Sequence, residues 1–109
     1  MYRVSKRIEI SAAHQLHLPY GSPCGHIHGH NWIIEVICES QGLNEQGMVV
    51  DFDHITRAVK QYDHKLLNDL LPQPTAENLG RAICEAVPNC VQVIVQESEG
   101  SVASYSLKG

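Results

Sequence analysis

Hydrophobic and polar residues alternate along two stretches within the first 40 residues, a pattern that indicates β-strands. The first stretch covers residues 2–14, and its even-numbered face is apolar from Ile8 until it ends in His14. The second covers residues 28–39 and is rich in β-branched and aromatic residues. One face of this second strand consists of His28, His30, Trp32, Ile34, Val36 and Cys38.

A different spacing in the middle of the chain predicts two amphipathic helices. The first is capped by Asp51 or Asp53 and runs to about Tyr62. The second follows Thr75, a favourable N-cap residue, and stops at Pro88. Their apolar stripes are Ile55, Ala58, Val59 and Tyr62 in the first helix, and Leu79, Ala82, Ile83 and Ala86 in the second.

The last twenty residues predict two more strands, at residues 90–97 and 101–107. A short strand extension is also expected at residues 48–50. The predicted fold class is α+β, a four-stranded antiparallel sheet with two helices on one face, in the order ββααββ. One face of the third strand carries Val91, Val93, Val95 and Glu97.

The composition limits the classes of function that fit. The chain of 109 residues is 43% hydrophobic and 18% charged, which predicts a single domain spanning residues 1–109. Its net charge is −4, and its longest cationic run is Lys6-Arg7, so we expect no binding to nucleic acid. It has no run of eighteen apolar residues and no recognisable secretory leader, so we expect no membrane span and a cytoplasmic location.

The four cysteines contain no C-x-x-C pair, and in a cytoplasmic chain their even number does not imply disulfides. Cys38 and Cys84 lie among apolar residues and are expected to be buried. Cys24 instead lies in a loop rich in glycine and proline, directly before a cluster of histidines. A nearby cation would lower the pKa of this thiol and make it a usable thiolate.

Three histidines form a candidate metal site. His28 and His30 point the same way from the start of the second strand. If the first strand pairs antiparallel with the second, His14 lies opposite them, where cross-strand Cβ atoms are about 4.5–5.5 Å apart. Imidazole suits Zn²⁺, and a catalytic zinc site takes three protein ligands and keeps one position open. We therefore predict Zn²⁺ at these three residues, with His26 as a rival or additional ligand.

Three other features of the sequence are candidates for chemistry, each with a plainer alternative. Asp63 and His64 place a carboxylate beside an imidazole that titrates near neutral pH, or simply form a polar surface after the first helix. Glu97 continues a face of valines, so it needs a partner if it is buried, or it reaches solvent at the strand end. Thr75 caps its helix and is a candidate for a further role.

Six motifs in one order closely resemble the 6-pyruvoyltetrahydropterin synthase family. They cover nearly the whole chain and comprise Ser11-Ala-Ala-His14, Cys24-x-x-x-His28-Gly-His30-Asn31, Gly47-Met-Val-Val-Asp-Phe52, Asp63-His64-x-x-Leu67-Asn68, Pro74-Thr75-x-Glu77-Asn78-Leu79 and Glu97. The three-residue gap between Cys24 and His28 resembles the 6-carboxytetrahydropterin synthase branch, of the queuosine and 7-deazaguanine pathway. The pyruvoyl-forming branch usually has a longer gap. Ile10 departs from the family, where many members have Phe.

This resemblance implies the tunnelling fold, in which four-stranded subunits join edge to edge as trimeric barrels. Two trimers would then stack into a homohexamer with active sites shared between subunits. Such an assembly would cover the two open edges that a four-stranded sheet leaves.

The resemblance also assigns roles. The three histidines would hold zinc, which polarises the side-chain oxygens of the substrate, 7,8-dihydroneopterin triphosphate. Cys24 would be the general base, and His64, oriented by Asp63, the partner acid or base. Glu97 would accept paired hydrogen bonds from the amino-pyrimidine edge of the pterin, with Thr75 near the ring. The products of this branch are 6-carboxytetrahydropterin, acetaldehyde and triphosphate.

Three alternatives stay open on the sequence alone. The first is a 6-pyruvoyltetrahydropterin synthase or a related pterin lyase. The second is a zinc-binding or pterin-binding protein without catalysis. The third is a structural zinc domain, which would use four protein ligands, with Cys24 as the fourth, and would unfold when the metal is chelated.

Overall fold

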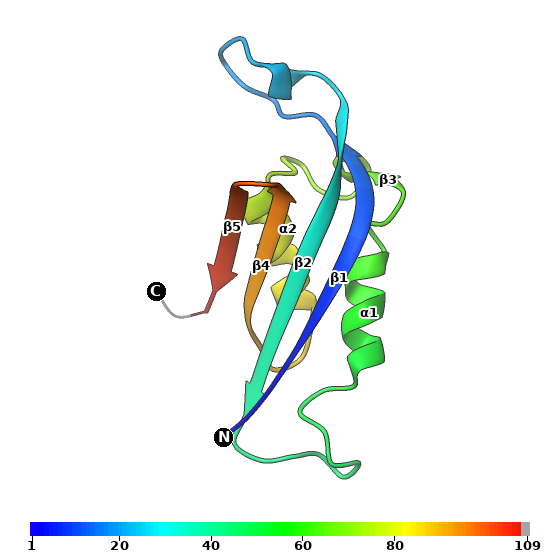
Figure 1. Ribbon diagram of the computed structural model, residues 1–109, viewed down its shortest axis with the longest axis vertical. Helices are drawn as coiled ribbons and strands as arrows, with labels where there is room; N and C mark the ends of the chain where they lie inside the picture. Colours follow the sequence, from blue (N-terminus) through cyan, green and yellow to red (C-terminus); the bar gives the residue numbers. More distant parts are fainter. Residues whose placement is uncertain (108–109) are drawn as a thin grey trace.

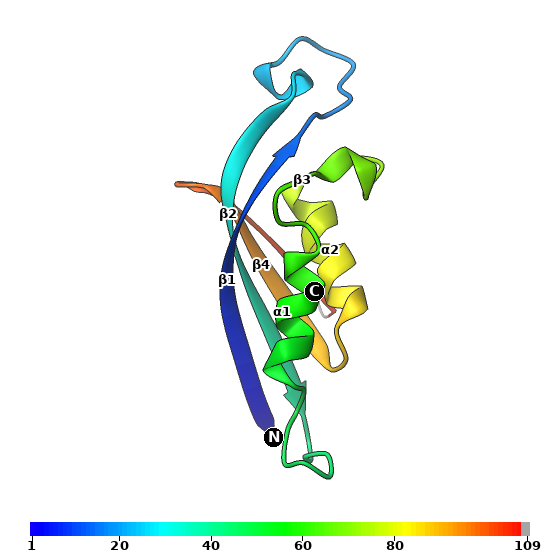
Figure 2. The same ribbon diagram turned by 90° about the vertical axis from the view of Figure 1, so that its right-hand side faces the viewer.

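The computed structural model describes residues 1–107 as one sheet with two helices packed on one of its faces (Figures 1 and 2). The strands lie in the order β3-β1-β2-β4-β5. Their bounds are Tyr2–His14 for β1, His28–Ser40 for β2, Lys65–Leu66 for β3, Cys90–Ser98 for β4 and Ser101–Ser106 for β5. The helices are α1, Phe52–Lys60, and α2, Ala76–Ala86, and two 3₁₀ turns are η1, Pro23–Gly25, and η2, Leu67–Asp69.

Four of these strands are the predicted ones, and they pair antiparallel in the order β1-β2-β4-β5. The predicted strand count of four is wrong, because β3 adds a fifth strand that pairs parallel with β1 at Ala12 and Ala13. With two residues, β3 is too short to show the alternation by which a strand is read from sequence. Residues 108 and 109 of the predicted domain lie outside the described residues.

The hairpin of β1 and β2 has the register that the sequence predicts. Ile10 pairs with Trp32 and His14 pairs with His28, so the even-numbered residues of both strands share the face toward the helices. The connection between the two strands, residues 15–27, projects beyond the end of the sheet (Figures 1 and 2). The histidines therefore lie where the hairpin leaves the body of the sheet.

The predicted alternation of β4 breaks near its start. Cys38 pairs with Cys90, but the preceding Ile37 pairs with Gln92, so Val91 is the extra residue of a β-bulge. Cys90 is consequently buried and Val91 only partly so, which corrects the expectation that Val91 continues the inner face. Beyond the bulge the prediction is right, because Val93 and Val95 are fully buried.

The helices begin where their capping residues predict. The Asp51 carboxylate accepts a hydrogen bond from the Asp53 N–H at the start of α1, and the Thr75 hydroxyl accepts one from the Asn78 N–H in α2. Helix α2 packs against β4 and β5, where a Cβ on Gly80 would lie 3.3 Å from the side chain of Val95. A residue without a side chain thus allows this helix to lie close to the sheet.

The core lies between the helices and the sheet. Its fully buried members include Trp32 and Ile34 from β2, Ile55 from α1, and Leu79 and Ile83 from α2.

The expected strand extension at residues 48–50 is wrong, since this segment is irregular, although two of its three residues are buried. Within residues 1–107, no helix has the length and apolar character needed to cross a bilayer.

Candidate metal centre and adjoining hollow

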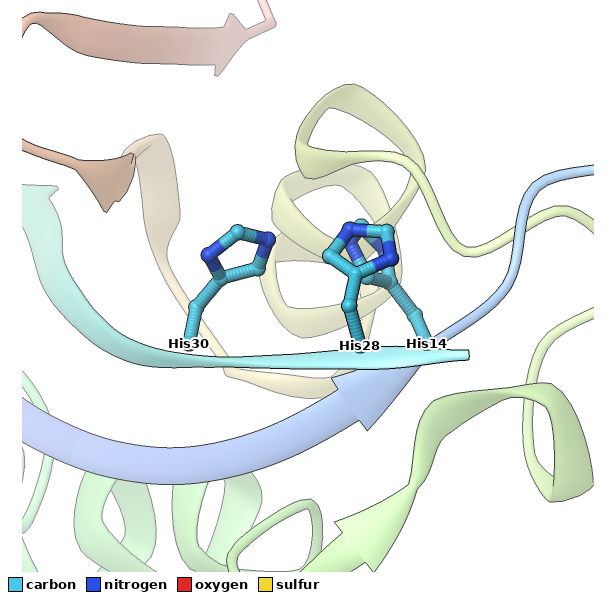
Figure 3. Close-up of side chains that lie close together, drawn as sticks. All are labelled: His14, His28 and His30. Carbon is cyan, nitrogen blue, oxygen red and sulfur yellow. The ribbon is translucent and has the colours of Figure 1, made fainter. Parts of the chain in front are cut away.

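His14, His28 and His30 rise from the same side of the β1–β2 pair and converge (Figure 3). One ring nitrogen of each lies within 4.8 Å of the others, so a single cation could contact all three. The cross-strand pairing of His14 with His28 brings their ring centroids to 4.5 Å. The two-residue period of β2 places His30 next to them, with its centroid 4.9 Å from that of His28.

Backbone carbonyls determine which nitrogen two of these rings offer. The Nδ1 atom of His14 lies 2.7 Å from the carbonyl oxygen of Pro74, and that of His28 lies 2.7 Å from the carbonyl oxygen of His26. A carbonyl oxygen only accepts, so each Nδ1 carries the proton and each Nε2 keeps a free lone pair. Metal-binding histidines are typically held in this way by a partner on the other nitrogen.

Two of the nitrogens in this cluster lack hydrogen-bond partners in the described chain. The Nε2 atoms of His14 and His30 are its two buried side-chain polar atoms without one. Leaving such groups unpaired costs free energy, which a bound cation would recover. Burial is the main cause that lowers the pKa of His30, and it outweighs the raising effect of Glu97. The ring is therefore neutral at physiological pH and able to donate its lone pair. The donor set fits a metal ion.

Trp32 forms the floor beneath the histidines. Its ring is fully buried and meets the rings of His14 and His30 edge-on, at centroid distances of 4.9 and 5.3 Å. The indole N–H donates to the carbonyl oxygen of Ala12 at 3.1 Å, which ties β2 to β1 directly below the site. A rigid aromatic floor restricts the rotation of the two imidazoles above it.

Glu97 closes one side of the centre. Its two carboxylate oxygens lie 3.7 Å from Nε2 of His14 and 3.6 Å from Nε2 of His30. The same residue and Thr75 line a hollow of about 490 Å³ between the start of α2, the β4–β5 turn and the connection after β1. The two residues predicted to contact the substrate thus share one hollow beside the histidines.

Cys24 lies apart from this cluster, in η1 on the projecting connection. Its carbonyl oxygen accepts a hydrogen bond from the N–H of Leu16, and its thiol is partly exposed. Among residues 1–107 the thiol is not within the group of ligand atoms that the three histidines form. The structure therefore places Cys24 at the same end of the sheet as the histidines without bringing it into contact with them.

Asp63 and His64 lie at the edge of β1. The Asp63 carboxylate accepts a hydrogen bond from the Ser11 N–H at 2.9 Å, and this bond is the main cause that lowers its pKa. Its other oxygen lies 3.7 Å from Nε2 of His64, whose side chain is 82% exposed and whose φ is +57°. His64 and Lys65 line an open hollow of about 530 Å³ with Ser11 and Asn31, two residues that alternate with the histidines and so face the opposite side of the sheet.

The chain matches the model of a known protein family. Residues 3–108 match the model of the 6-pyruvoyl tetrahydropterin synthase family. The chain belongs to this family.

Relatives within the family point to one branch of it. The chain is 29% identical to the 6-carboxy-5,6,7,8-tetrahydropterin synthase of Bacillus subtilis, over 98% of this chain and 86% of that protein. It is 46% identical to the putative enzyme of the same name from Pyrococcus horikoshii, over 54% of this chain and 37% of that protein. The predicted family is thereby confirmed, and the names of these relatives support the predicted carboxytetrahydropterin branch.

The fold is that of the family as well. The structure of 6-pyruvoyl tetrahydropterin synthase from Caenorhabditis elegans superposes with a TM-score of 0.75 at 21% identity, covering 96% of this chain and 94% of that one. This likeness confirms the predicted α+β tunnelling fold.

A third relative has a different name: the chain is 32% identical to the dihydroneopterin monophosphate aldolase of Pyrococcus furiosus, over 78% of this chain and 74% of that protein.

In this member of the family, backbone groups that the sequence did not reveal complete the site. The carbonyl oxygens of Pro74 and His26 orient two of the histidines, and a carbonyl leaves no trace in residue identity. The only available signal was the presence of Pro74 in a family motif. The indole N–H of Trp32 likewise requires the folded register before its partner can be recognised.

Proposed function

We propose that this protein is a zinc-dependent lyase of the carboxytetrahydropterin branch, acting in queuosine and 7-deazaguanine biosynthesis. It would convert 7,8-dihydroneopterin triphosphate and water to 6-carboxytetrahydropterin, acetaldehyde and triphosphate. The observation that carries the proposal is the convergence of three imidazoles, two of them oriented by backbone carbonyls, beside a hollow that contains Glu97. Family membership supplies the class of substrate. A cytoplasmic location stays a prediction of the sequence.

The residues divide the work of binding. His14, His28 and His30 would hold Zn²⁺ through their unprotonated nitrogens. A bound zinc ion would supply Lewis-acid polarisation of the side-chain oxygens of the substrate, which acidifies the adjacent C–H groups. Glu97 would accept two hydrogen bonds from the amino-pyrimidine edge of the pterin, since a carboxylate matches a pair of parallel N–H donors. Thr75, which lines the same hollow, would contact the ring.

Proton transfer would fall to Cys24 and to the pair of Asp63 and His64. The Cys24 thiolate would remove a proton from the substrate side chain, and His64 would return or remove a second one. Asp63 lies 3.7 Å from the His64 ring and would hold it in position. In one chain these groups are separate, because Cys24 lies in the projecting connection and His64 at the outer edge of β1.

This separation supports an assembly in which neighbouring copies complete each other's sites. We propose the homohexamer of two stacked trimers that the family resemblance implies. Strand β5 ends the sheet on one side, and β1 has β3 beside it at two residues only, so both edges offer backbone groups for pairing. Light scattering should give the mass of six chains. Cys24→Ala and His64→Ala chains, inactive alone, should recover activity when refolded together; failure to recover it would contradict shared sites.

Product analysis tests the reaction itself. Zinc-loaded protein incubated with 7,8-dihydroneopterin triphosphate should release acetaldehyde and triphosphate, and Cys24→Ala should abolish turnover while keeping its zinc. A pyruvoyl product without acetaldehyde would assign the chain to the other branch. No turnover with retained pterin binding would favour a binding protein, and unfolding by chelators would favour a structural zinc domain.

The aldolase relative supports a second candidate, cleavage of the side-chain carbon–carbon bond of a dihydroneopterin phosphate. The two reactions differ in their two-carbon product. Aldol cleavage would release a phosphorylated two-carbon aldehyde, whereas the proposed lyase releases unphosphorylated acetaldehyde. The same incubation, repeated with the monophosphate as substrate, separates them.

A further inference from the structure

The connection after β1 begins with three residues that are held as if they were still part of a sheet. The side-chain amide of Asn68 accepts a hydrogen bond from the Gln15 N–H and donates one to the Gln15 carbonyl, both at 2.8 Å. The amide of Gln73 does the same for His17, at 3.0 and 3.1 Å. Two side chains therefore replace the neighbouring strand that residues 15–17 lack. We call Asn68 and Gln73 the amide brace.

The braced segment in turn holds the turn that carries Cys24. The Leu16 N–H donates to the Cys24 carbonyl oxygen at 2.9 Å, and the Gln15 side-chain amide donates to the Gly25 carbonyl oxygen at 2.9 Å. The amide brace holds the backbone of Gln15 directly. Leu16 lies between Gln15 and His17, which are both held in this way. The position of η1 relative to β1 thus depends on the brace.

The other end of the brace reaches the metal centre and α2. Gln73 precedes Pro74, whose carbonyl oxygen accepts from His14 Nδ1. The Gln73 carbonyl oxygen accepts from the side-chain amide of Asn78 in α2 at 2.8 Å. A continuous set of hydrogen bonds therefore runs from α2 through Gln73 to the braced segment and on to Cys24, with His14 attached at the same point.

We infer that Asn68 and Gln73 are positioning residues that fix the Cys24 thiol relative to the three histidines. For catalysis this inference rests on the proposed function, but the position of the thiol can be measured without any turnover. Cys24 is the partly exposed cysteine, whereas Cys38, Cys84 and Cys90 are buried. Alkylation of the folded protein by iodoacetamide should therefore report on Cys24 alone, and its pH profile follows the thiolate fraction.

The test compares Asn68→Ala and Gln73→Ala with two matched controls far from the site. Asn44→Ala removes a side-chain amide that also bonds to backbone, in the loop after β2, and Gln61→Ala removes one at the end of α1. We expect the brace variants to change the alkylation rate or shift its pH midpoint, by about threefold or more in rate. Turnover should fall about 10- to 100-fold with KM nearly unchanged, since misplacing a reacting group has this effect.

Gln15→Ala provides a variant that keeps the brace. It removes the bond to Gly25, while the backbone bonds of residue 15 to Asn68 remain. This variant should reproduce the change in alkylation with little change in melting temperature. The inference is overturned if alkylation in Asn68→Ala and Gln73→Ala matches the two controls, or if the controls change as much. If alkylation changes and no pterin is turned over by the parent protein, the proposed function fails and the brace stands.

Discussion

The Nδ1 atom of His14 lies 2.7 Å from the carbonyl oxygen of Pro74, a residue 60 positions away in the chain. This bond aims the other nitrogen of the ring at His28 and His30. The segment before α2 therefore determines the chemistry offered by a residue at the end of β1. The His14 imidazole thus connects the end of β1 to the segment that precedes α2.

Replacing any one of the three histidines by Ala should reduce bound zinc from about one ion per chain to a small fraction, because a site with two nitrogen ligands binds far more weakly. Atomic emission after dialysis measures this. His54→Ala is the matched control, since His54 lies in α1 outside the cluster. Equal zinc loss in the control, or full zinc in the cluster variants, would contradict the assignment.

Glu97→Gln should weaken pterin binding about 10- to 100-fold, because hydrogen bonds to a charged acceptor contribute about 1.5–3 kcal/mol. Bound zinc should not change. Pterin fluorescence on titration with protein measures the affinity. Glu99→Gln, an exposed neighbour in the β4–β5 turn, controls for the loss of charge. If the two variants bind pterin equally well, Glu97 does not contact the ring.

Asp63 should make stability depend on pH in the acid range. The Ser11 N–H holds its folded pKa below the ordinary 3.8, so the folded state favours the carboxylate. A lowered carboxyl pKa stabilises the fold above the unfolded value and loses that contribution as pH falls through the folded pKa. Urea unfolding should therefore show Asp63→Asn less stable than the parent at pH 7, with the difference shrinking below about pH 4. A difference independent of pH would refute this.

Two leucines of different burial test the core. Leu79 of α2 is fully buried, whereas Leu70 is 46% exposed. Leu79→Ala should lower the free energy of unfolding by about 2–5 kcal/mol through lost burial and a cavity. Leu70→Ala should change it by about 0.5 kcal/mol. Urea titration of both variants measures the contrast, and similar losses would mean that α2 does not pack as described.

Much of this molecule follows from local patterns. The period of two in β1 and β2 predicted the histidine cluster, and the capping residues Asp51 and Thr75 predicted where the helices begin. The features that the sequence did not predict depend on contacts between residues far apart in the chain. Strand β3 is defined only by the pairing of its two residues with β1. The bulge at Val91 is defined only by the pairing of β4 with β2. The contact of Glu97 with the histidines required the order of β2 and β4 in the sheet.

In β1 and β2 the even-numbered residues face the same side of the sheet, so the metal-binding and core side chains depend on one strand register. The imidazoles occupy the same alternate positions as Ile10, Trp32 and Ile34, which fill the core. A slip of one residue by either strand would turn that strand's histidine and core side chains to the opposite face together. A misregistered hairpin would therefore expose its hydrophobic side chains along with its ligands, and quality control in the cell would meet an unfolded chain and never a stable but inactive enzyme.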